Sequence, residues 1–238
     1  MRALRILSIL LGILIVLGIA ADRLTVWFAE NEVAGRLQTR YGLAEEPDVT
    51  IQGFPFLTQV AGRSFDHVDA TLNSYEAAVD GQLLTVEDLR IELRDVEVTG
   101  GFTDAAAETA TGSGLISYEE LTRAYGELLG GVDNGFSVEF RQGEGDQLLL
   151  ALQVAVAGQS LTLDEIPGTL VVDDGAITLE VDDADIPDMP GDAGATVREQ
   201  LNTPRSIEGL PQGLALDSLT PTEGGLRADV SGSGVVLN

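Results

Sequence analysis

The chain of 238 residues contains no cysteine, no lysine and a single histidine. Without cysteine there is no disulfide bond, no thiol nucleophile and no lipid-modified cysteine. Without lysine there is no phosphate-binding P-loop, no lysine Schiff base and no Ser–Lys catalytic pair. Because zinc and most transition metals prefer imidazole or thiolate ligands, we expect neither a metal centre nor a cofactor.

The single histidine, His67, also limits nucleophilic catalysis. It lies in an alternating segment, 65–72, on the side that carries polar residues. A Ser-His-Asp triad would need it, but this position is more typical of a solvent-facing residue. Glycoside hydrolysis needs only two carboxylates, so 39 acidic residues leave that chemistry open. Sugar sites are usually rich in aromatic residues, which make up 5% of this chain, and we predict that the protein is not an enzyme.

Positive charge is scarce as well. Arginine supplies all 13 basic residues against 39 acidic ones, and the formal net charge is −26. This balance excludes a nucleic-acid-binding surface, which needs clustered cations, and argues against adsorption to anionic lipid headgroups. The acidic run formed by Asp182, Asp183, Asp185 and Asp188 lacks the glycine and terminal glutamate of a calcium-binding EF-hand, so it predicts a solvated loop.

The N-terminus carries the clearest pattern in the sequence. Arg2 and Arg5 precede an apolar run, Ile6–Ala21, in which only Ser8 is polar. A basic start followed by such a run is typical of a secretory signal or a signal anchor. The positive-inside rule then places both arginines in the cytoplasm and the chain after Asp22 on the extracytoplasmic face of the cytoplasmic membrane.

The sequence favours a retained anchor over a cleaved signal. The run is slightly shorter than the roughly 20 residues of a usual span, but Trp27 and Phe28 can extend it into the interface. A helical pattern also continues from Asp22 to Arg40 and stops at Gly42. We therefore predict an anchor or signal peptide over 1–21 and a single domain over 22–238.

The body reads mainly as antiparallel strands. The alternation in 84–98 slips once at Asp88, which predicts a β-bulge. Ser117 and Glu120 form a capping box ahead of a helix over 118–129, and Asp174-Gly175 predicts a tight hairpin. Further strands are expected at 48–52, 65–72, 136–141, 147–156, 160–163, 169–173, 176–181, 214–219 and 226–237, with a short helix at 195–201. The order predicts an α+β fold rather than βαβ repeats.

The segment Gly53-Phe-Pro-Phe-Leu57 is the most unusual one. Pro55 restricts its own backbone and that of Phe54 to extended conformations, so we expect Phe54 and Phe56 to project to the same side. Either these residues form a corner of the core, or they form the apolar lip of a lipid-binding groove.

Two motifs in the body carry a family resemblance. The first is Val49-x-Ile51-x-Gly53-Phe-Pro-Phe-Leu-Thr-Gln59 with Phe65 and Val68 after it, and the second is Ile207-x-Gly-Leu-Pro-x-Gly213 with its following leucines. Together they resemble the actinobacterial phospholipid-binding family of the mycobacterial lipomannan elongation factor (LmeA-like). That family is similar to tubular lipid-binding domains, so the resemblance implies a long N-terminal helix packed on a strongly curved antiparallel sheet, with one or two further short helices.

The resemblance also implies the function. We expect a lipid-binding or lipid-transfer protein that supports envelope lipoglycan assembly, with a phosphatidylinositol-type or other phospholipid as ligand and an envelope glycosyltransferase as a possible partner. A carboxylate-dependent hydrolase or transferase of envelope glycans, or a scaffold for an envelope enzyme, is the alternative. Arg63 is the candidate for the lipid headgroup. The full set of predicted lipid-binding residues is Trp27, Phe28, Phe54, Pro55, Phe56, Leu57, Arg63, Leu210 and Pro211.

Overall fold

The computed structural model describes the chain in nine stretches. They are residues 2–79, 81–99, 104–130, 136–156, 159–173, 175–182, 184–186, 203–208 and 210–237. The predicted helix over 195–201, and Asp183 and Asp188 of the acidic run, lie outside them.

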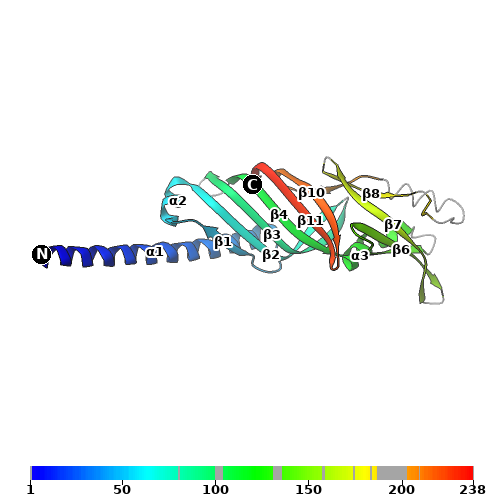
Figure 1. Ribbon diagram of the computed structural model, residues 1–238, viewed down its shortest axis with the longest axis horizontal. Helices are drawn as coiled ribbons and strands as arrows, with labels where there is room; N and C mark the ends of the chain where they lie inside the picture. The colour runs from blue at the N-terminus through cyan, green and yellow to red at the C-terminus, as the bar shows by residue number, and fades with distance from the viewer. Residues whose placement is uncertain are drawn as a thin grey trace.

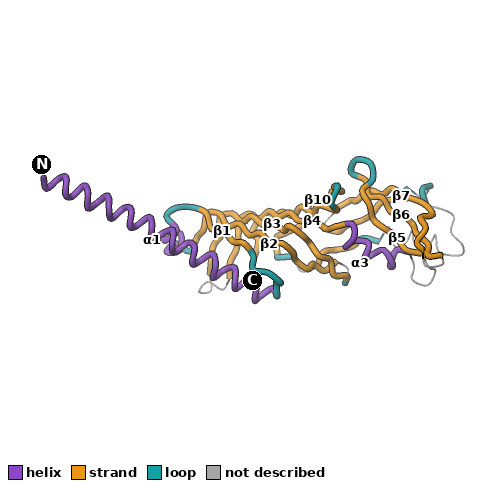
Figure 2. The backbone as a smooth tube through the Cα atoms, turned by 90° about the horizontal axis from the view of Figure 1, so that it is seen from below, coloured by secondary structure: helices purple, strands orange, loops and turns teal. Residues whose placement is uncertain are grey.

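A single helix, α1 (Arg2–Tyr41), joins the apolar run to the body. Its 40 residues span about 60 Å at the usual rise of an α-helix. The N-terminal half projects away from the rest of the molecule, and the C-terminal half lies along the sheet (Figures 1 and 2). The helix ends before Gly42, which has a φ of 63°, as the sequence predicts. The projecting part is apolar and long enough to cross a membrane.

The body is one antiparallel sheet of eleven strands that curls around its own axis. The strand order is β10-β11-β4-β3-β2-β9-β8-β7-β6-β5, and β1 pairs with β2 beside this path. Because β10 also lies against β7, the sheet forms a nearly closed barrel from β10 round to β7. The strands are β1 (Asp48–Gln52), β2 (Ser64–Val79), β3 (Gln82–Thr99), β4 (Asp104–Ser117), β5 (Phe136–Gln142), β6 (Gln147–Val156), β7 (Gln159–Asp173), β8 (Ala176–Val181), β9 (Arg205–Glu208), β10 (Gln212–Thr222) and β11 (Gly225–Leu237).

The predicted fold class, a long helix on a curved antiparallel sheet, is confirmed. The predicted bulge is present at Asp88, which has a φ of 50° where the register between β3 and β4 shifts. The hairpin between β7 and β8 closes with Asp173 opposite Ala176, which leaves two residues in the loop. Local alternation and turn chemistry therefore locate these features correctly.

The third helix, α3 (Tyr118–Gly130), begins as predicted but with a different cap. Ser117 Oγ accepts a hydrogen bond from the backbone N–H of Glu120 at 3.2 Å. The Glu120 carboxylate does not complete the capping box, since it accepts the backbone N–H of Thr85 at 2.7 Å and pairs with Arg123 at 2.6 Å. The glutamate therefore joins α3 to β3.

Four elements differ from the sequence-based expectation. A short helix, α2 (Phe56–Gly62), follows Pro55 where extended chain was expected. The two expected strands at 160–163 and 169–173 form one continuous strand, β7, which pairs with β6 from Gln159 to Thr169. Strands β4 and β9 were not predicted; β4 is rich in Ala, Thr and Gly and pairs with β3 and β11 on its two sides.

Candidate binding cavity

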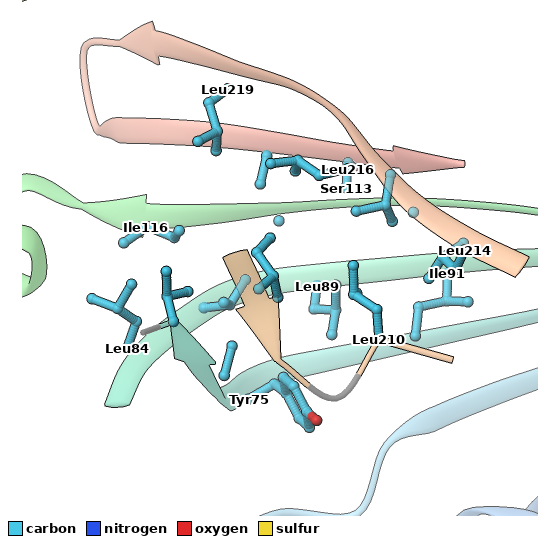
Figure 3. A pocket seen from close by; sticks show the side chains of 18 of the residues that line it. Tyr75, Leu84, Leu89, Ile91, Ser113, Ile116, Leu210, Leu214, Leu216 and Leu219 are labelled. Carbon is cyan, nitrogen blue, oxygen red and sulfur yellow. The ribbon is translucent and has the colours of Figure 1, made fainter. Parts of the chain in front are cut away.

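A cavity of about 620 Å³ lies inside the barrel (Figure 3). The strands from β2 to β4 and from β7 to β11 all contribute to its wall, and the end of α1 contributes Leu37 and Tyr41. The volume is within the range of about 300–1,000 Å³ typical of small-molecule sites. The cavity therefore has room for an extended apolar group.

The wall is almost entirely apolar. In Figure 3 the side chains of β2, β3, β4 and β10 converge on the same space from different strands. Among the described residues that line it there is no aspartate or glutamate, and Arg205 is the only charged one. The labelled wall residues are Tyr75, Leu84, Leu89, Ile91, Ser113, Ile116, Leu210, Leu214, Leu216 and Leu219.

Small residues on β4 shape one side of the cavity. Gly112 and Gly114 line it, and a Cβ at these positions would lie 2.9 Å from Val230 Cγ2 and 2.4 Å from Val86 Cγ1. Such separations are shorter than any normal carbon–carbon contact. The missing side chains at Gly112 and Gly114 therefore leave room for Val230 of β11 and Val86 of β3 to approach the β4 backbone. Strand β4 itself fills little of the interior.

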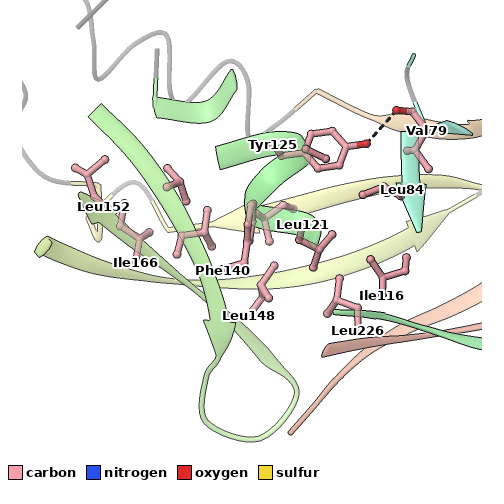
Figure 4. Close-up of a cluster of buried hydrophobic side chains, with 14 of the residues drawn as sticks. Val79, Leu84, Ile116, Leu121, Tyr125, Phe140, Leu148, Leu152, Ile166 and Leu226 are labelled. Carbon is pink, nitrogen blue, oxygen red and sulfur yellow. Dashed lines mark hydrogen bonds between the residues drawn. The ribbon is translucent and has the colours of Figure 1, made fainter. Parts of the chain in front are cut away.

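A packed core closes the barrel at the α3 end. Leu121 and Tyr125 of α3 meet Phe140 and Leu148 of the β5–β6 hairpin there (Figure 4). The Tyr125 hydroxyl donates a hydrogen bond to the carbonyl oxygen of Val79 at 3.0 Å. This cluster therefore forms the floor of the cavity, since several of its members also line the cavity wall.

Arg205 lies at this end of the cavity, at the start of β9. Its guanidinium carbon is 5.2 Å from the centre of the Tyr125 ring, a cation–π distance. The residue is half-buried, so its charge lies in a less polar setting than the surface arginines. An anionic group at this end of the cavity would meet the Arg205 cation.

A second core cluster fills the end of the barrel nearest the projecting half of α1. Phe56 of α2 and Phe65 of β2 form its centre, with ring centroids 6.0 Å apart. Val26 of α1 and Val96 of β3 pack against them. None of these four residues lines the cavity, so this cluster separates the cavity from the Phe-Pro-Phe turn.

The predicted lipid-binding residues fall into two groups. Leu210 and Pro211 line the cavity. The others lie at the opposite end, beside the point where α1 leaves the barrel, and do not line it. They are Trp27, Phe28, Phe54, Pro55, Phe56, Leu57 and Arg63.

The two phenylalanines of the turn have different surroundings, so the expectation that they share one side is wrong. Phe54 is 60% exposed and Phe56 is 2% exposed. The reason is that Phe56 begins α2, which turns its side chain into the core while Phe54 remains outside. Phe56 therefore belongs to the core, as the first interpretation predicts, whereas Phe54 is exposed and does not line the cavity.

Arg63, the predicted headgroup contact, joins α2 to the sheet through its backbone. It follows α2 with a left-handed φ of 55°, and its carbonyl oxygen accepts the N–H of Val98 at 3.0 Å. Its side chain is exposed at the surface. Sequence reasoning missed Arg205 as the cation nearest the cavity, because a single arginine in a short segment carries no recognisable pattern.

His67 belongs to a polar cluster on β2 and β3. Its Nε2 lies 2.8 Å from Asp69 Oδ1 and 3.4 Å from Glu92 Oε1. The three side chains are close enough to share a cation, but Gln52 and Arg94 already contact the two carboxylates. The arrangement is a polar cluster that joins β1, β2 and β3.

Fold and cavity together define a class of protein. A nearly closed barrel whose described wall is apolar except for Arg205 is suited to hold an amphipathic small molecule. Comparison with known proteins agrees: the model of the LmeA-like phospholipid-binding family matches residues 20–231. The chain belongs to the LmeA-like phospholipid-binding family. No curated protein and no solved structure matches it.

Proposed function

We propose that the protein binds phospholipid on the extracytoplasmic face of the cytoplasmic membrane, with acyl chains in the barrel cavity and without catalysis. The observation that carries this proposal is the apolar cavity of about 620 Å³ in a chain of a phospholipid-binding family. In this proposal residues 6–21 are a retained anchor, and residues 22–238 act as one lipid-binding domain. The role of the protein is to support envelope lipoglycan assembly beside a glycosyltransferase.

The energetics favour acyl binding despite the acidic surface. Burial of each methylene stabilises the complex by about 0.8 kcal/mol, so one ordinary chain contributes on the order of 10 kcal/mol. Surface charges act on a headgroup through salt solution, which screens them over about 8 Å. The net charge of −26 therefore weakens anionic binding far less than acyl burial strengthens it.

We further propose that Arg205 contacts the phosphate of the bound lipid. Arg205 is the only charge among the described residues of the cavity wall, and guanidinium binds phosphate through paired hydrogen bonds. Arg63 is the weaker candidate because its side chain lies outside the cavity, beyond the Phe56–Phe65 cluster.

The alternatives require different features. A scaffold protein needs a filled core and an exposed docking face, whereas this barrel contains open space. A carboxylate-dependent hydrolase needs two carboxylates at the site, and the described cavity wall contains none. Neither alternative is favoured by a specific observation.

A photo-crosslinking experiment tests the proposal. The full chain, reconstituted in phosphatidylcholine–phosphatidylglycerol vesicles, is irradiated with a phospholipid that carries a photoreactive group on its acyl chain, and the adducts are mapped by mass spectrometry. We expect adducts on inward residues of β3 and β10, such as Leu89 and Leu216. Adducts confined to the apolar part of α1 would refute binding in the cavity.

Charge substitutions locate the headgroup. Arg205→Gln should reduce cavity adducts from both phosphatidylglycerol and phosphatidylcholine about tenfold, because both lipids carry the phosphate and one charge-assisted hydrogen bond is typically worth about 1.5–3 kcal/mol. Arg227→Gln is the matched control, because it removes the same charge from an exposed site on β11. If Arg63→Gln lowers the adducts and Arg205→Gln does not, the headgroup lies at the other end.

A further inference from the structure

Exposed apolar side chains from two separate segments gather where α1 leaves the barrel. Leu24, Trp27 and Phe28 of α1 are 61%, 57% and 65% exposed. Phe54 of the turn before α2 and Leu57 of α2 itself are 60% and 48% exposed. We call these five residues the collar. Residues three and four apart share a face of a helix, so the three from α1 form one continuous surface.

The collar is tied to the helix by polar contacts. Asp22 is 3% exposed and is the only buried charged residue in the described part of the chain. Its Oδ1 accepts the backbone N–H of Leu57 at 3.0 Å, and its Oδ2 pairs with Arg23 at 2.7 Å. Arg23 also donates to the carbonyl oxygen of Gly53 at 3.1 Å, and its guanidinium carbon lies 5.4 Å from the centre of the Phe54 ring.

These contacts hold the turn and the helix together at one level along α1. Arg23 and Trp27 are one helical turn apart on α1. The Phe54 ring therefore contacts the helix one turn before the Trp27–Phe28 pair, whose ring centroids are 4.9 Å apart. A buried carboxylate is costly unless it is paired and hydrogen-bonded, and Asp22 meets both conditions. The collar is therefore a fixed part of the barrel and not a set of loose surface residues.

The collar continues the apolar surface of α1. Along the helix from Ile9 to Ile19 the large apolar side chains are all exposed, and Leu24, Trp27 and Phe28 follow directly. Aromatic rings favour the level of the lipid headgroups at the edge of a bilayer, and an arginine there extends its charge toward water. A bilayer interface is the partner that matches both the exposed span and the ring of aromatic residues beside it.

We propose that the collar sits in the interfacial layer of a phospholipid bilayer and fixes the orientation of the barrel on the membrane. This inference rests on the retained anchor of the proposed function. A helix that ended in a flexible linker would let the barrel swing freely. Here the helix is continuous and the turn before α2 enters the same layer, so the end of the barrel that holds the Phe56–Phe65 cluster faces the lipid.

Trp27 is the only tryptophan of the chain and serves as the probe. The full chain is reconstituted in phosphatidylcholine–phosphatidylglycerol vesicles with bromine at a shallow or a deep acyl position. We expect Trp27 emission to be blue-shifted, quenched at least twofold more by shallow than by deep bromine, and poorly accessible to aqueous acrylamide. The double variant W27F/F54W should behave in the same way, because Phe54 belongs to the collar.

A control at matched exposure is W27F/L83W. Leu83 is 57% exposed, as Trp27 is, but it lies at the far end of β2 and β3. The 16 residues of β2 separate the two ends by about 50 Å at the usual rise of a strand. We expect this probe to remain accessible to acrylamide and insensitive to bromine.

Two results would overturn the proposal while the chain still floats with the vesicles. One is acrylamide access at positions 27 and 54 equal to that at position 83. The other is protection from acrylamide with no bromine quenching, which would mean that a protein partner or a second copy covers the collar. A chain that fails to float would refute the anchor and the collar together, whereas acyl crosslinking in the cavity would still report on lipid binding.

The tie through Asp22 is tested in the same assay. Adding Asp22→Ala to W27F/F54W removes the acceptor of the Leu57 N–H, so we expect acrylamide access at position 54 to rise at least twofold. Asp22→Ala alone should leave Trp27 at its depth, because Trp27 belongs to α1 itself. No change at position 54 would show that Asp22 does not hold the turn in the membrane.

Discussion

Partial filling of the cavity should abolish tight lipid binding without unfolding the protein. Ala228 of β11 lines the cavity opposite Leu219 of β10 and Gly114 of β4. Ala228→Phe would place a ring in space that is open. We expect a change in the free energy of unfolding below about 1 kcal/mol, compared with about 1–3 kcal/mol for the same enlargement in a packed core.

The effect on lipid binding should be much larger. If the ring excludes about four methylenes of an acyl chain, binding loses on the order of 3 kcal/mol, which is roughly 100-fold in affinity. The assay is an equilibrium titration of the full chain in detergent micelles with a phospholipid that carries a fluorescent acyl chain. Urea unfolding of the lipid-free protein gives the stability.

Ala151→Phe is the control for this experiment. Ala151 is fully buried on β6 and does not line the cavity. We expect it to lower the free energy of unfolding by about 1–3 kcal/mol and to leave the affinity of the folded protein nearly unchanged. Undiminished affinity in Ala228→Phe, with the fold intact, would refute acyl binding at this position.

Two predictions concern the start of α3. The Arg123 guanidinium lowers the pKa of Glu120 from its usual 4.5 to about 2, so the folded state gains stability above about pH 4.5 and loses it as pH falls toward 2. Glu120→Gln should therefore destabilise the protein by on the order of 1–2 kcal/mol at pH 7, after allowance for solvent screening, and by clearly less near pH 3, as measured by urea unfolding at both pH values. An equal loss at both values would contradict an ionic role. Ser117→Ala should cost about 0.5–2 kcal/mol at either pH, since it removes the cap of Glu120 N–H; no change in the urea midpoint would show that solvent satisfies this N–H equally well.

Much of the fold followed from local patterns. The apolar run, the helical periodicity after Asp22 and the stop at Gly42 predicted α1, because each signal acts within a few residues. The bulge at Asp88 and the hairpin before Ala176 were also predicted correctly, since alternation and turn chemistry are local properties. The resemblance carried by the two motifs then gave the curvature of the sheet and the family.

Other elements depended on partners far along the chain. Strand β4 has little alternation of its own, and its small residues form a strand through pairing with β3 and β11, which lie on its two sides. The helix α2 is too short for periodicity to reveal it, and Phe56 is buried because Phe65 and Val26 pack against it. Pro167 would normally interrupt a strand, yet β7 continues through it while paired with β6.

The candidate site shows the same division. Leu210 and Pro211 were chosen from a motif and do line the cavity. Of the aromatic residues chosen with them, Trp27, Phe28 and Phe54 lie in the collar and Phe56 is buried in the core. Arg205 went unnoticed because its place in the cavity depends on β9 joining β2 to β8. No residue spacing in the sequence predicts that β9 pairs with both β2 and β8.

The amino-acid sequence was enough to predict the apolar helix, the acidic body, the antiparallel strands and the likeness to a phospholipid-binding family. Each of these depends on composition, periodicity or a short motif, which are local properties. Tertiary contacts decided that the barrel encloses a cavity, that Arg205 is the charge on its described wall and that the Phe-Pro-Phe turn lies outside it beside α1. This difference arises because the cavity depends on closure of the barrel. A cavity exists only when strands distant in sequence meet around it, and which side chains face it depends on how the sheet curls.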